Sequence, residues 1–212
     1  MMTALSRYLI ALFAVLALAS CSNTELALMP KERLQGIHSN RATIPAPSPQ
    51  LMSASQAKPR DRHKMPIYPF RERQRVVRTT AYTCSEDDHL IYGSKNAAGT
   101  PLRYTNRVRS AAADWSFYPV GTTFRIKGLP YLYVVDDYGS ALTGTGTIDL
   151  YKPSKQVMNL WGRRNVEITI VRWGSFKRSA EILKDRTRFP HCARMLANIF
   201  RQQPSLRYVS TR

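Results

Sequence analysis

Acidic residues and long apolar runs are scarce in this sequence. The chain has 14 Asp and Glu against 32 Lys and Arg, and its net charge of +18 predicts anionic partners. The apolar run at residues 8–19 is too short, and wrongly flanked, for a membrane-spanning helix. No internal repeat is visible, which excludes a repeat architecture.

Residues 1–20 have the pattern of a secretory signal. Arg7 lies in a short polar lead, the apolar run follows, and the sequence Leu-Ala-Ser-Cys ends at Cys21. This ending is similar to the lipobox of bacterial lipoproteins, in which cleavage precedes the cysteine and the cysteine carries the lipid. An ordinary signal peptide with a chance cysteine is the alternative. Because Ser22 rather than Asp follows Cys21, we expect a lipid anchor in the outer membrane, facing the periplasm.

Export narrows the choice of anionic partner. Outside the cytoplasm the available anions are membrane headgroups and the carboxylates and phosphates of the cell envelope. Nucleic acid, which the charge alone allows, is therefore not an expected partner. A further envelope protein that places the chain at its target stays an open possibility.

Residues 21–75 are rich in Pro, Ser, Gln and basic residues. Seven of the thirteen prolines lie within residues 30–69, and little in this region can form a core. We therefore predict a disordered, Pro-rich basic linker behind the lipidated cysteine. Its last part contains Ile67, Tyr68 and Phe70, which can pack on the surface of the domain that follows.

Residues 76–175 are expected to form one compact domain with mostly β-structure. Short runs rich in β-branched and aromatic residues, separated by turn formers, predict six strands and hence a small barrel. The runs are residues 76–82, 108–112, 122–126, 131–136, 148–151 and 166–173. Residues 153–162 predict one short helix, with proline in its first turn and glycine at its end.

Residues 176–212 form a basic C-terminal extension. It holds nine basic and two acidic side chains around two amphipathic segments, one with Ile182 and Leu183 and one running from Cys192 to Phe200. We expect these helices to pack on the barrel in preference to lying on an anionic surface.

Two cysteines remain if Cys21 carries lipid. An even pair in an oxidising compartment predicts a disulfide between Cys84 and Cys192, with two buried thiols as the alternative. The acidic residues and histidine at 86–89 resemble a metal cluster, but neighbours in one loop rarely converge on one ion. We expect a solvated acidic loop there, and neither metal nor cofactor.

The stretch at residues 134–151 organises the domain. An apolar strand ends in Asp136 and Asp137, a glycine-rich loop follows, and a second short strand returns one more carboxylate at Asp149. Because side chains alternate along a strand, Asp136 and Asp137 are expected on opposite faces, with one of them solvated. Carboxylates held in this way indicate acid/base chemistry, although Asp and Gly also form ordinary turns.

Five segments of the domain resemble a known family. They are Thr-Ala-Tyr-Thr at 80–83, Ala-Asp-Trp-Ser-Phe-Tyr-Pro-Val-Gly-Thr at 113–122, Asp-Tyr-Gly-Ser-Ala-Leu at 137–142, Ile-Asp-Leu-Tyr at 148–151 and Trp-Gly-Arg-Arg at 161–164. In order and spacing they are similar to the 3D domain, named for its three aspartates. The resemblance implies a double-psi β-barrel like that of membrane-bound lytic transglycosylase A and its small single-domain relatives.

The family's three aspartates fall on Asp114, Asp137 and Asp149. The resemblance implies that Asp137 is the acid/base, with its pKa raised by burial and by the other two carboxylates. It also implies that the loop residues Gly139, Ser140 and Ala141 bind the glycan. Tyr82 and Arg103 are further candidates for gripping the sugar or a peptide carboxylate.

The implied reaction is cleavage of the β-1,4 bond between N-acetylmuramic acid and N-acetylglucosamine in peptidoglycan glycan strands, leaving a 1,6-anhydro end. The alternative is a catalytically silent peptidoglycan-binding lipoprotein module. Tyr138 and Ser140 differ from the family's usual Thr and Gly, and no second domain completes a groove, which favours the alternative. The three retained aspartates favour the enzyme, because crowded like charges cost stability.

Overall fold

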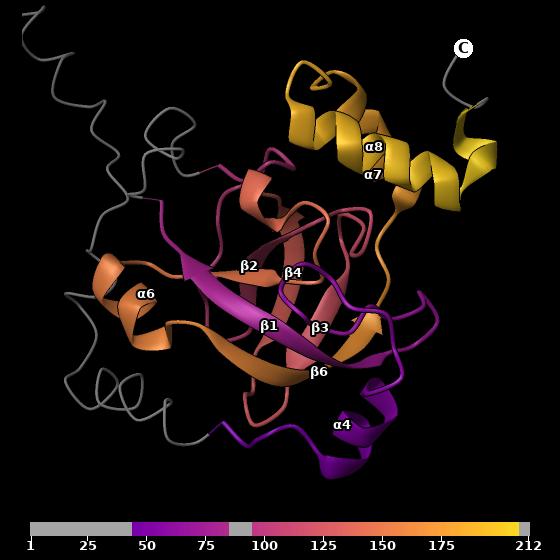
Figure 1. Cartoon of the computed structure of the whole chain (residues 1–212). Helices are drawn as coiled ribbons and strands as arrows, with labels where there is room; N and C mark the ends of the chain where they lie inside the picture. The colour runs from indigo at the N-terminus through magenta and orange to yellow at the C-terminus, as the bar shows by residue number, and fades with distance from the viewer. Residues whose placement is uncertain (1–43, 85–94, 208–212) are drawn as a thin grey trace, which may run out of the picture.

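A closed barrel of six strands forms the centre of the computed structural model, which describes residues 44–84 and 95–207 (Figure 1). The strands are β1 (Gln74–Tyr82), β2 (Val108–Ala113), β3 (Thr123–Ile126), β4 (Leu132–Asp137), β5 (Ile148–Tyr151) and β6 (Arg164–Arg172). Each coincides with one of the predicted strands, so the mainly β barrel is confirmed. Within the described ranges, no helix has the length and apolar character that a membrane crossing requires.

Alternating side chains give the barrel an apolar interior. In β5, Ile148 and Leu150 are fully buried, whereas Asp149 between them is half-buried on the outer face. Removal of each such apolar side chain from water contributes about 1.5–3 kcal/mol. Large side chains of the same core cluster that are fully buried include Trp115, Tyr118, Phe124, Tyr133, Ile168 and Ile170.

The strand order around the barrel is β1-β5-β2-β4-β3-β6. The pairs β1/β5 and β2/β4 are parallel, and the other four pairs are antiparallel. This mixed closed barrel is consistent with the predicted double-psi β-barrel. The predicted short helix is α6 (Lys155–Trp161), where the Ser154 hydroxyl accepts a hydrogen bond from the Val157 amide (3.3 Å) and Gly162, at φ +60°, ends the helix.

Residues 44–75 do not form the expected linker. The helix α4 (Pro49–Ser55) packs on β1, and Asp61, Met65 and Tyr68 are buried. The predicted contact of residues 67–70 with the domain is confirmed by Tyr68, and the Phe70 ring packs at a tilt against Trp173 with ring centroids 3.9 Å apart. A few anchoring side chains are thus enough to order a segment whose composition is that of a linker.

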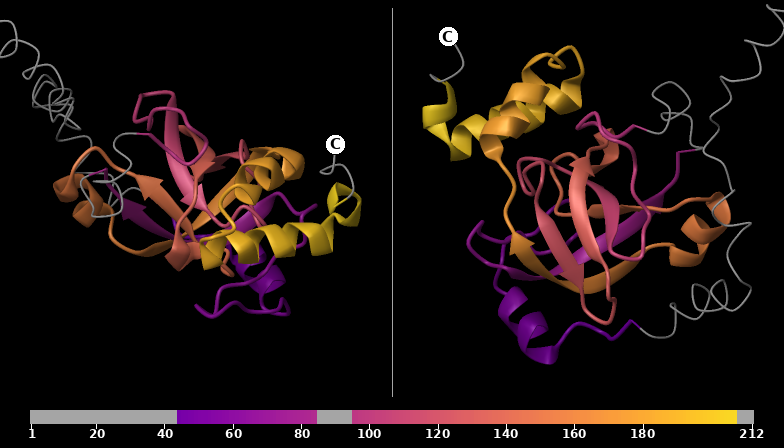
Figure 2. Two further views of the ribbon diagram at one scale, coloured as in Figure 1. Left: turned by 90° about the horizontal axis from the view of Figure 1, so that it is seen from above. Right: turned by 180° about the vertical axis from the view of Figure 1, so that it is seen from behind.

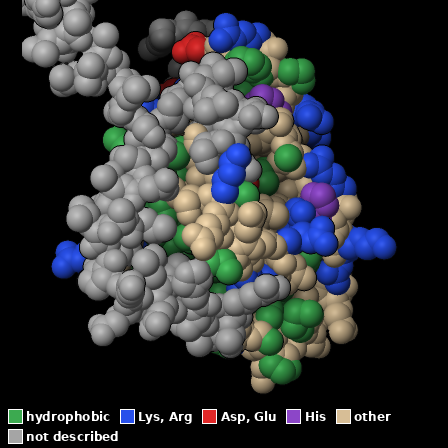
Figure 3. Space-filling model, turned by 90° about the vertical axis from the view of Figure 1, so that its left-hand side faces the viewer, with side chains coloured by type: hydrophobic (Ala, Val, Ile, Leu, Met, Phe, Trp, Pro, Cys, Tyr) green, Lys and Arg blue, Asp and Glu red, His purple; other side chains and the backbone are tan. Residues whose placement is uncertain are grey.

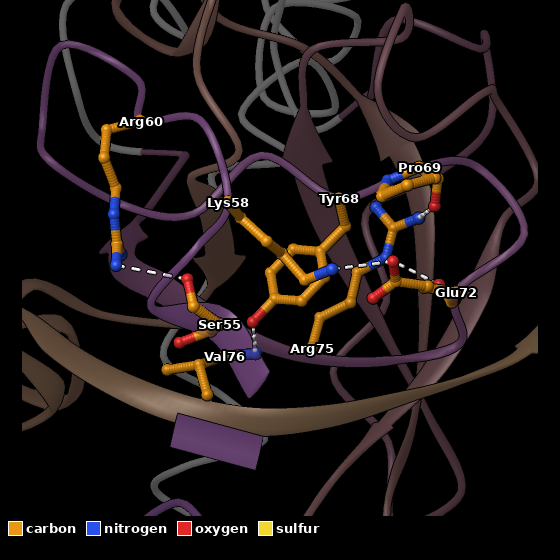
Figure 4. A network of polar contacts seen from close by, with 8 residues as sticks. All are labelled: Ser55, Lys58, Arg60, Tyr68, Pro69, Glu72, Arg75 and Val76. Atoms are coloured by element: carbon orange, nitrogen blue, oxygen red, sulfur yellow. Dashed lines mark hydrogen bonds and ion pairs between the residues drawn. The ribbon is translucent and has the colours of Figure 1, made fainter. Parts of the chain in front are cut away.

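Polar contacts fix this segment against the start of β1 (Figure 4). The Val76 amide donates to the Tyr68 hydroxyl (2.9 Å), and the buried Arg75 guanidinium donates to the carbonyls of Pro69 and Glu72. An ion pair of 2.7 Å joins Lys58 to Glu72. Residues 56–73 are called the N-terminal arm below.

The C-terminal extension is helical, as predicted. The helices α7 (Phe176–Lys184) and α8 (Pro190–Gln202), followed by the short helix η2 (Pro204–Arg207), lie at the opposite end of the barrel from α4 (Figures 1 and 2). Leu183, Met195 and Ile199 are fully buried in the core cluster. These helices therefore pack on the barrel.

The connection from β6 to α7 passes very close to the backbone of residues 119–122. A Cβ atom on Gly174 would lie 2.3 Å from the carbonyl oxygens of Pro119 and Val120. Only glycine fits at this position, because both obstructing atoms belong to the backbone.

The predicted disulfide between Cys84 and Cys192 is wrong, because Cys192 carries a free, buried thiol. Cys84 belongs to a small cluster with Tyr82 and Tyr151 on the outer face of β1 and β5, whereas Cys192 lies in the main core at the start of α8. The predicted signal peptide, the lipidated Cys21 and the acidic loop at 86–89 lie outside the described residues.

Candidate active site

Strand register brings two of the three aspartates onto one surface. Asp149 of β5 pairs with Thr80 of β1 on one side and with Ala112 of β2 on the other, and Ala112 in turn pairs with Asp137 of β4. Directly paired residues point to the same face of a sheet. Asp137 and Asp149 therefore flank the small side chain of Ala112, with Cα atoms two strand spacings, about 10 Å, apart.

A β-bulge places Asp136 on this surface too. The register of β2 against β4 shifts between Ala111 and Ala112, so that Val135 and Asp137 have partners and Asp136 is the extra residue. A bulge interrupts the alternation of faces. The expectation that Asp136 and Asp137 face opposite ways, with one solvated, is therefore wrong: both are 5 % exposed.

Donors from three segments of the described chain hold Asp137. Its Oδ1 accepts hydrogen bonds from the amides of Ala97 and Tyr138 (both 3.0 Å), and its Oδ2 accepts from the Tyr82 hydroxyl (3.1 Å). Burial and the charges of Asp137, Asp136 and Asp149 raise the pKa of Tyr82 well above its usual value. Tyr82 therefore stays protonated and donates its hydroxyl proton to Asp137.

The carboxyl group of Asp136 keeps its proton to a higher pH than an ordinary aspartate does. Its Oδ2 accepts from the Ser110 hydroxyl (2.8 Å), whereas its buried Oδ1 has no hydrogen-bond partner among residues 44–84 and 95–207. Burial, together with the charge of Asp137, raises the pKa of Asp136 to about 7, against the opposing effects of Ser110 and Arg103. Arg103 itself is exposed, and its backbone hydrogen-bonds with Ser110.

The raised pKa of Asp136 predicts a pH-dependent stability. Because the folded chain keeps this proton above the ordinary carboxyl pKa of 3.8, it binds more protons than the unfolded chain, and stability falls as the pH rises toward and through 7. Asp136→Asn is uncharged and isosteric. We expect its stability advantage over the wild type to widen by about 2–3 kcal/mol between pH 5 and pH 8, measured by urea unfolding. A constant difference between the two proteins would contradict the assignment.

Asp114 is not part of this surface cluster. It is fully buried, and its Oδ1 accepts from the amide (2.7 Å) and hydroxyl (2.6 Å) of Ser116, while its Oδ2 accepts from the Gly144 amide (2.6 Å). Burial raises the pKa of Asp114, and these hydrogen bonds oppose the rise. Its contacts make it a structural support that fixes the glycine-rich loop.

The glycine-rich loop borders the aspartates. Ser140 and Ala141 are exposed in the short helix η1 (Ser140–Leu142), whose Leu142 packs with Tyr82 and Ala112. Gly139 has extended backbone angles that other residues also adopt. The exposed pair is therefore open to contact from solvent.

The N-terminal arm is bonded to this same loop. The buried Asp61 accepts from the Gly146 amide (3.0 Å), and the Arg62 guanidinium donates to the Ala141 carbonyl. The arm therefore lies against the glycine-rich loop, a contact that the sequence did not predict. Its scattered anchors carry no periodic pattern that could have revealed it.

The unusual Tyr138 turns away from the loop. Its ring meets Trp115 edge to face at 5.0 Å and lies 5.7 Å from His191 of α8, and its hydroxyl accepts from Arg186 (3.1 Å). Burial raises the pKa of Tyr138 to about 12. Tyr138 therefore anchors the helical extension. Because its ring points away from the glycine-rich loop, having Tyr in place of the family's usual Thr does not narrow the space beside that loop.

One further titratable group, Lys152, was not predicted from the sequence. Lys152 is buried against the rings of Tyr104 and Trp161, and burial, with the charges of Arg109 and Arg164, lowers its pKa to about 7. In the described part of the chain, no three His, Cys, Asp or Glu side chains are placed to hold a metal ion.

Comparison with known families agrees with the sequence reading. Residues 109–172 match the family model described as 3D domain, which confirms the resemblance. The matched segment is less than a third of the chain, contains all three aspartates, and leaves out β1, the N-terminal arm and α7–α8. No curated protein matches the chain in sequence.

Proposed function

Since residues 109–172 carry a 3D domain, we propose that this protein is a peptidoglycan lytic transglycosylase. That family is associated with peptidoglycan-related, lytic-transglycosylase-like domains. The observation that carries the proposal is the outer-face row in which Asp137 and Asp149 flank Ala112, with Tyr82 donating to Asp137. Glycan strands are the proposed partner, and a lipid at Cys21 is the proposed anchor.

Asp137 is the proposed acid/base. As a carboxylic acid it gives its proton to the glycosidic oxygen, and the bond from that oxygen to C1 of N-acetylmuramic acid breaks. As a carboxylate it then takes the proton of the sugar's own C6 hydroxyl, whose oxygen forms the new bond to C1. One carboxyl group thus serves both steps, and no water is consumed.

Asp136 supports this cycle as a store of protons. With a pKa of about 7 it is protonated for about half of the time at neutral pH, directly beside Asp137 in the chain. The pair can therefore carry one proton over the neutral range, as close carboxyl groups do. Asp149, whose Oδ1 accepts from the Thr80 hydroxyl (2.7 Å), faces the same space and is proposed to orient a sugar hydroxyl.

The second candidate function is a catalytically silent module that binds the wall. A binder would use the same outer face, with the exposed Ser140 and Ala141 and the adjacent N-terminal arm as contact surfaces. A binding module would not need an acid/base at Asp136 and Asp137, and the burial of these two carboxyl groups would only lower its stability.

The two functions differ in what they release from the cell wall. We expect the full chain, purified in detergent, to release soluble muropeptides from purified sacculi in a time-dependent way and in proportion to enzyme. The control is the same incubation with heat-unfolded chain. Co-sedimentation with the sacculi without any release would support the binding module and contradict the enzyme.

A further inference from the structure

A basic cleft lies on the barrel beside the aspartates. It measures about 430 Å³ and is lined by His63, Met65, Arg78, Arg163, Arg164 and Asn165. The lining comes from three segments: the N-terminal arm, the middle of β1 and the start of β6. Figure 3 shows Lys and Arg side chains (blue), with a histidine (purple) among them, gathered along the right-hand side of the molecule. Few Asp or Glu side chains (red) are visible in this view.

The positive charge of the cleft is not neutralised by its lining, which includes no carboxylate among the described residues. Burial and the neighbouring charge of Arg163 lower the pKa of Arg78, while Asp61 and Asp149 oppose this. Both oxygens of Asp61 already accept backbone hydrogen bonds, from His63, Met65 and Gly146. Arginines crowded in this way gain stability when an anion joins them.

The cleft and the aspartate row share one surface. Arg78 pairs with Asn165 of β6, and Thr80, two residues further along β1, pairs with Asp149. Residues two apart on a strand point to the same face and lie about 6.6 Å from each other. A ligand that spans this distance would contact Asp149 and the guanidinium groups together.

We infer that this cleft binds a carboxylate of the peptide stem that peptidoglycan carries on its muramic acid. The inference rests on the proposed function, because it takes the glycan strand to lie along the aspartate row. Arg78 and Arg163 supply planar donors that match a carboxylate, Asn165 supplies an amide, and the arm residues His63 and Met65 close the cleft. The cleft thus selects glycan whose stem peptides are still attached.

A membrane phosphate is the competing source of negative charge. A lipid headgroup would lie on a flat bilayer surface, and most of its binding would depend on the total basic charge of the exposed surface. The cleft instead is a hollow formed beside the proposed catalytic groups, and it has a side chain, Met65, that is buried within it. A single anionic group attached to the substrate polymer fits this hollow better than a bilayer does.

The test is the binding of Arg163→Gln to three preparations. Arg163 is exposed, so that its replacement should not disturb the fold. Arg163 lies just before β6, and the matched control is Arg172→Gln, which removes one exposed arginine at the far end of that strand. The preparations are intact sacculi, sacculi stripped of stem peptides by an amidase, and vesicles of anionic phospholipid. All chains carry Asp137→Asn so that no glycan is cut during the measurement.

We expect Arg163→Gln to weaken binding to intact sacculi about three- to tenfold more than Arg172→Gln does. On peptide-free glycan the two variants should bind equally. Equal losses on intact sacculi, or a specific loss that persists on peptide-free glycan, would overturn the inference. A specific loss on vesicles that exceeds the loss on sacculi would assign the cleft to lipid phosphate instead.

This result is independent of catalysis. A peptide-dependent loss in Arg163→Gln, with no muropeptide release by the wild type, would retain the carboxylate cleft and reject the transglycosylase. Release by the wild type, with no peptide-dependent loss of binding in the variant, would retain the transglycosylase and reject the carboxylate cleft.

Discussion

Asp137→Asn is expected to lower the initial rate of muropeptide release by about 10²–10⁴-fold, the usual contribution of a positioned acid/base. The amide group that replaces the carboxyl neither gives nor takes a proton under these conditions. The fold should persist, because the Asn oxygen can still accept from the Ala97 and Tyr138 amides while its NH₂ donates to the Tyr82 hydroxyl, which can turn to accept.

The matched control for this variant is the neighbouring Asp136→Asn. It removes an equally buried carboxyl group from the same bulge but leaves Asp137 in place, so we expect it to lose less than about tenfold. Both rates are measured on sacculi, with thermal unfolding and co-sedimentation as tests of folding and binding. If Asp137→Asn kept a rate within tenfold of the wild type, Asp137 would not be the acid/base.

Asp114→Ala is expected to destabilise the fold by at least about 3 kcal/mol. It leaves the amides of Ser116 and Gly144, and the Ser116 hydroxyl, without their acceptor in a fully buried place, and each unsatisfied buried group costs about 1–3 kcal/mol. Asp114→Asn should lose an intermediate amount, because its NH₂ group would face the Gly144 amide, donor against donor. Urea unfolding of the two variants and the wild type measures their free energies of unfolding and so tests this expected ranking.

The contrast between the two aspartates is informative because the same change, Asp to Asn, has opposite expected outcomes. At Asp137 the second oxygen meets a hydroxyl that can reverse its hydrogen bond, whereas at Asp114 it meets an amide that cannot. An Asp114→Asn chain as stable as the wild type, yet inactive, would show that Asp114 takes part in the chemistry and is more than a support.

The strands could be predicted because each carries its own local signal. β1, β4 and β6 are runs of β-branched and aromatic residues, and the alternation of buried and outer side chains in β5 follows directly from strand geometry. The carboxylates at 136, 137 and 149 could be singled out because they lie in or at the end of apolar strands, and the choice of Asp137 over Asp136 came from the resemblance to the 3D domain. The proposed row thus has a visible origin in the sequence.

The bulge at Asp136 could not be predicted, because it depends on how β2 and β4 pair. Nothing in the local sequence Val-Val-Asp-Asp indicates that one residue has no partner on β2. Simple alternation along the strand therefore predicted that the two carboxyl groups point to opposite faces. Similarly, counting cysteines paired Cys84 with Cys192, although the fold places them in different clusters. Both errors concern contacts between segments far apart in the chain.

The N-terminal arm was missed for a different reason. Its average composition is that of a linker, and its order depends on individual contacts: Asp61 with the Gly146 amide and Tyr68 with the Val76 amide. Tyr68 was the visible signal, since an aromatic residue in a basic, Pro-rich segment indicates an anchor. Asp61 gave no such signal, because an isolated aspartate is common in loops.

The chemical form of the sugar end released by the wild type tests the central claim most directly. Mass spectrometry of the soluble products, after the full chain has acted on purified sacculi, distinguishes the possible ends by mass. The account predicts 1,6-anhydro-muramic acid ends, because the C6 hydroxyl replaces water as the nucleophile. Reducing ends would contradict it and indicate a hydrolase that uses a second carboxylate to activate water.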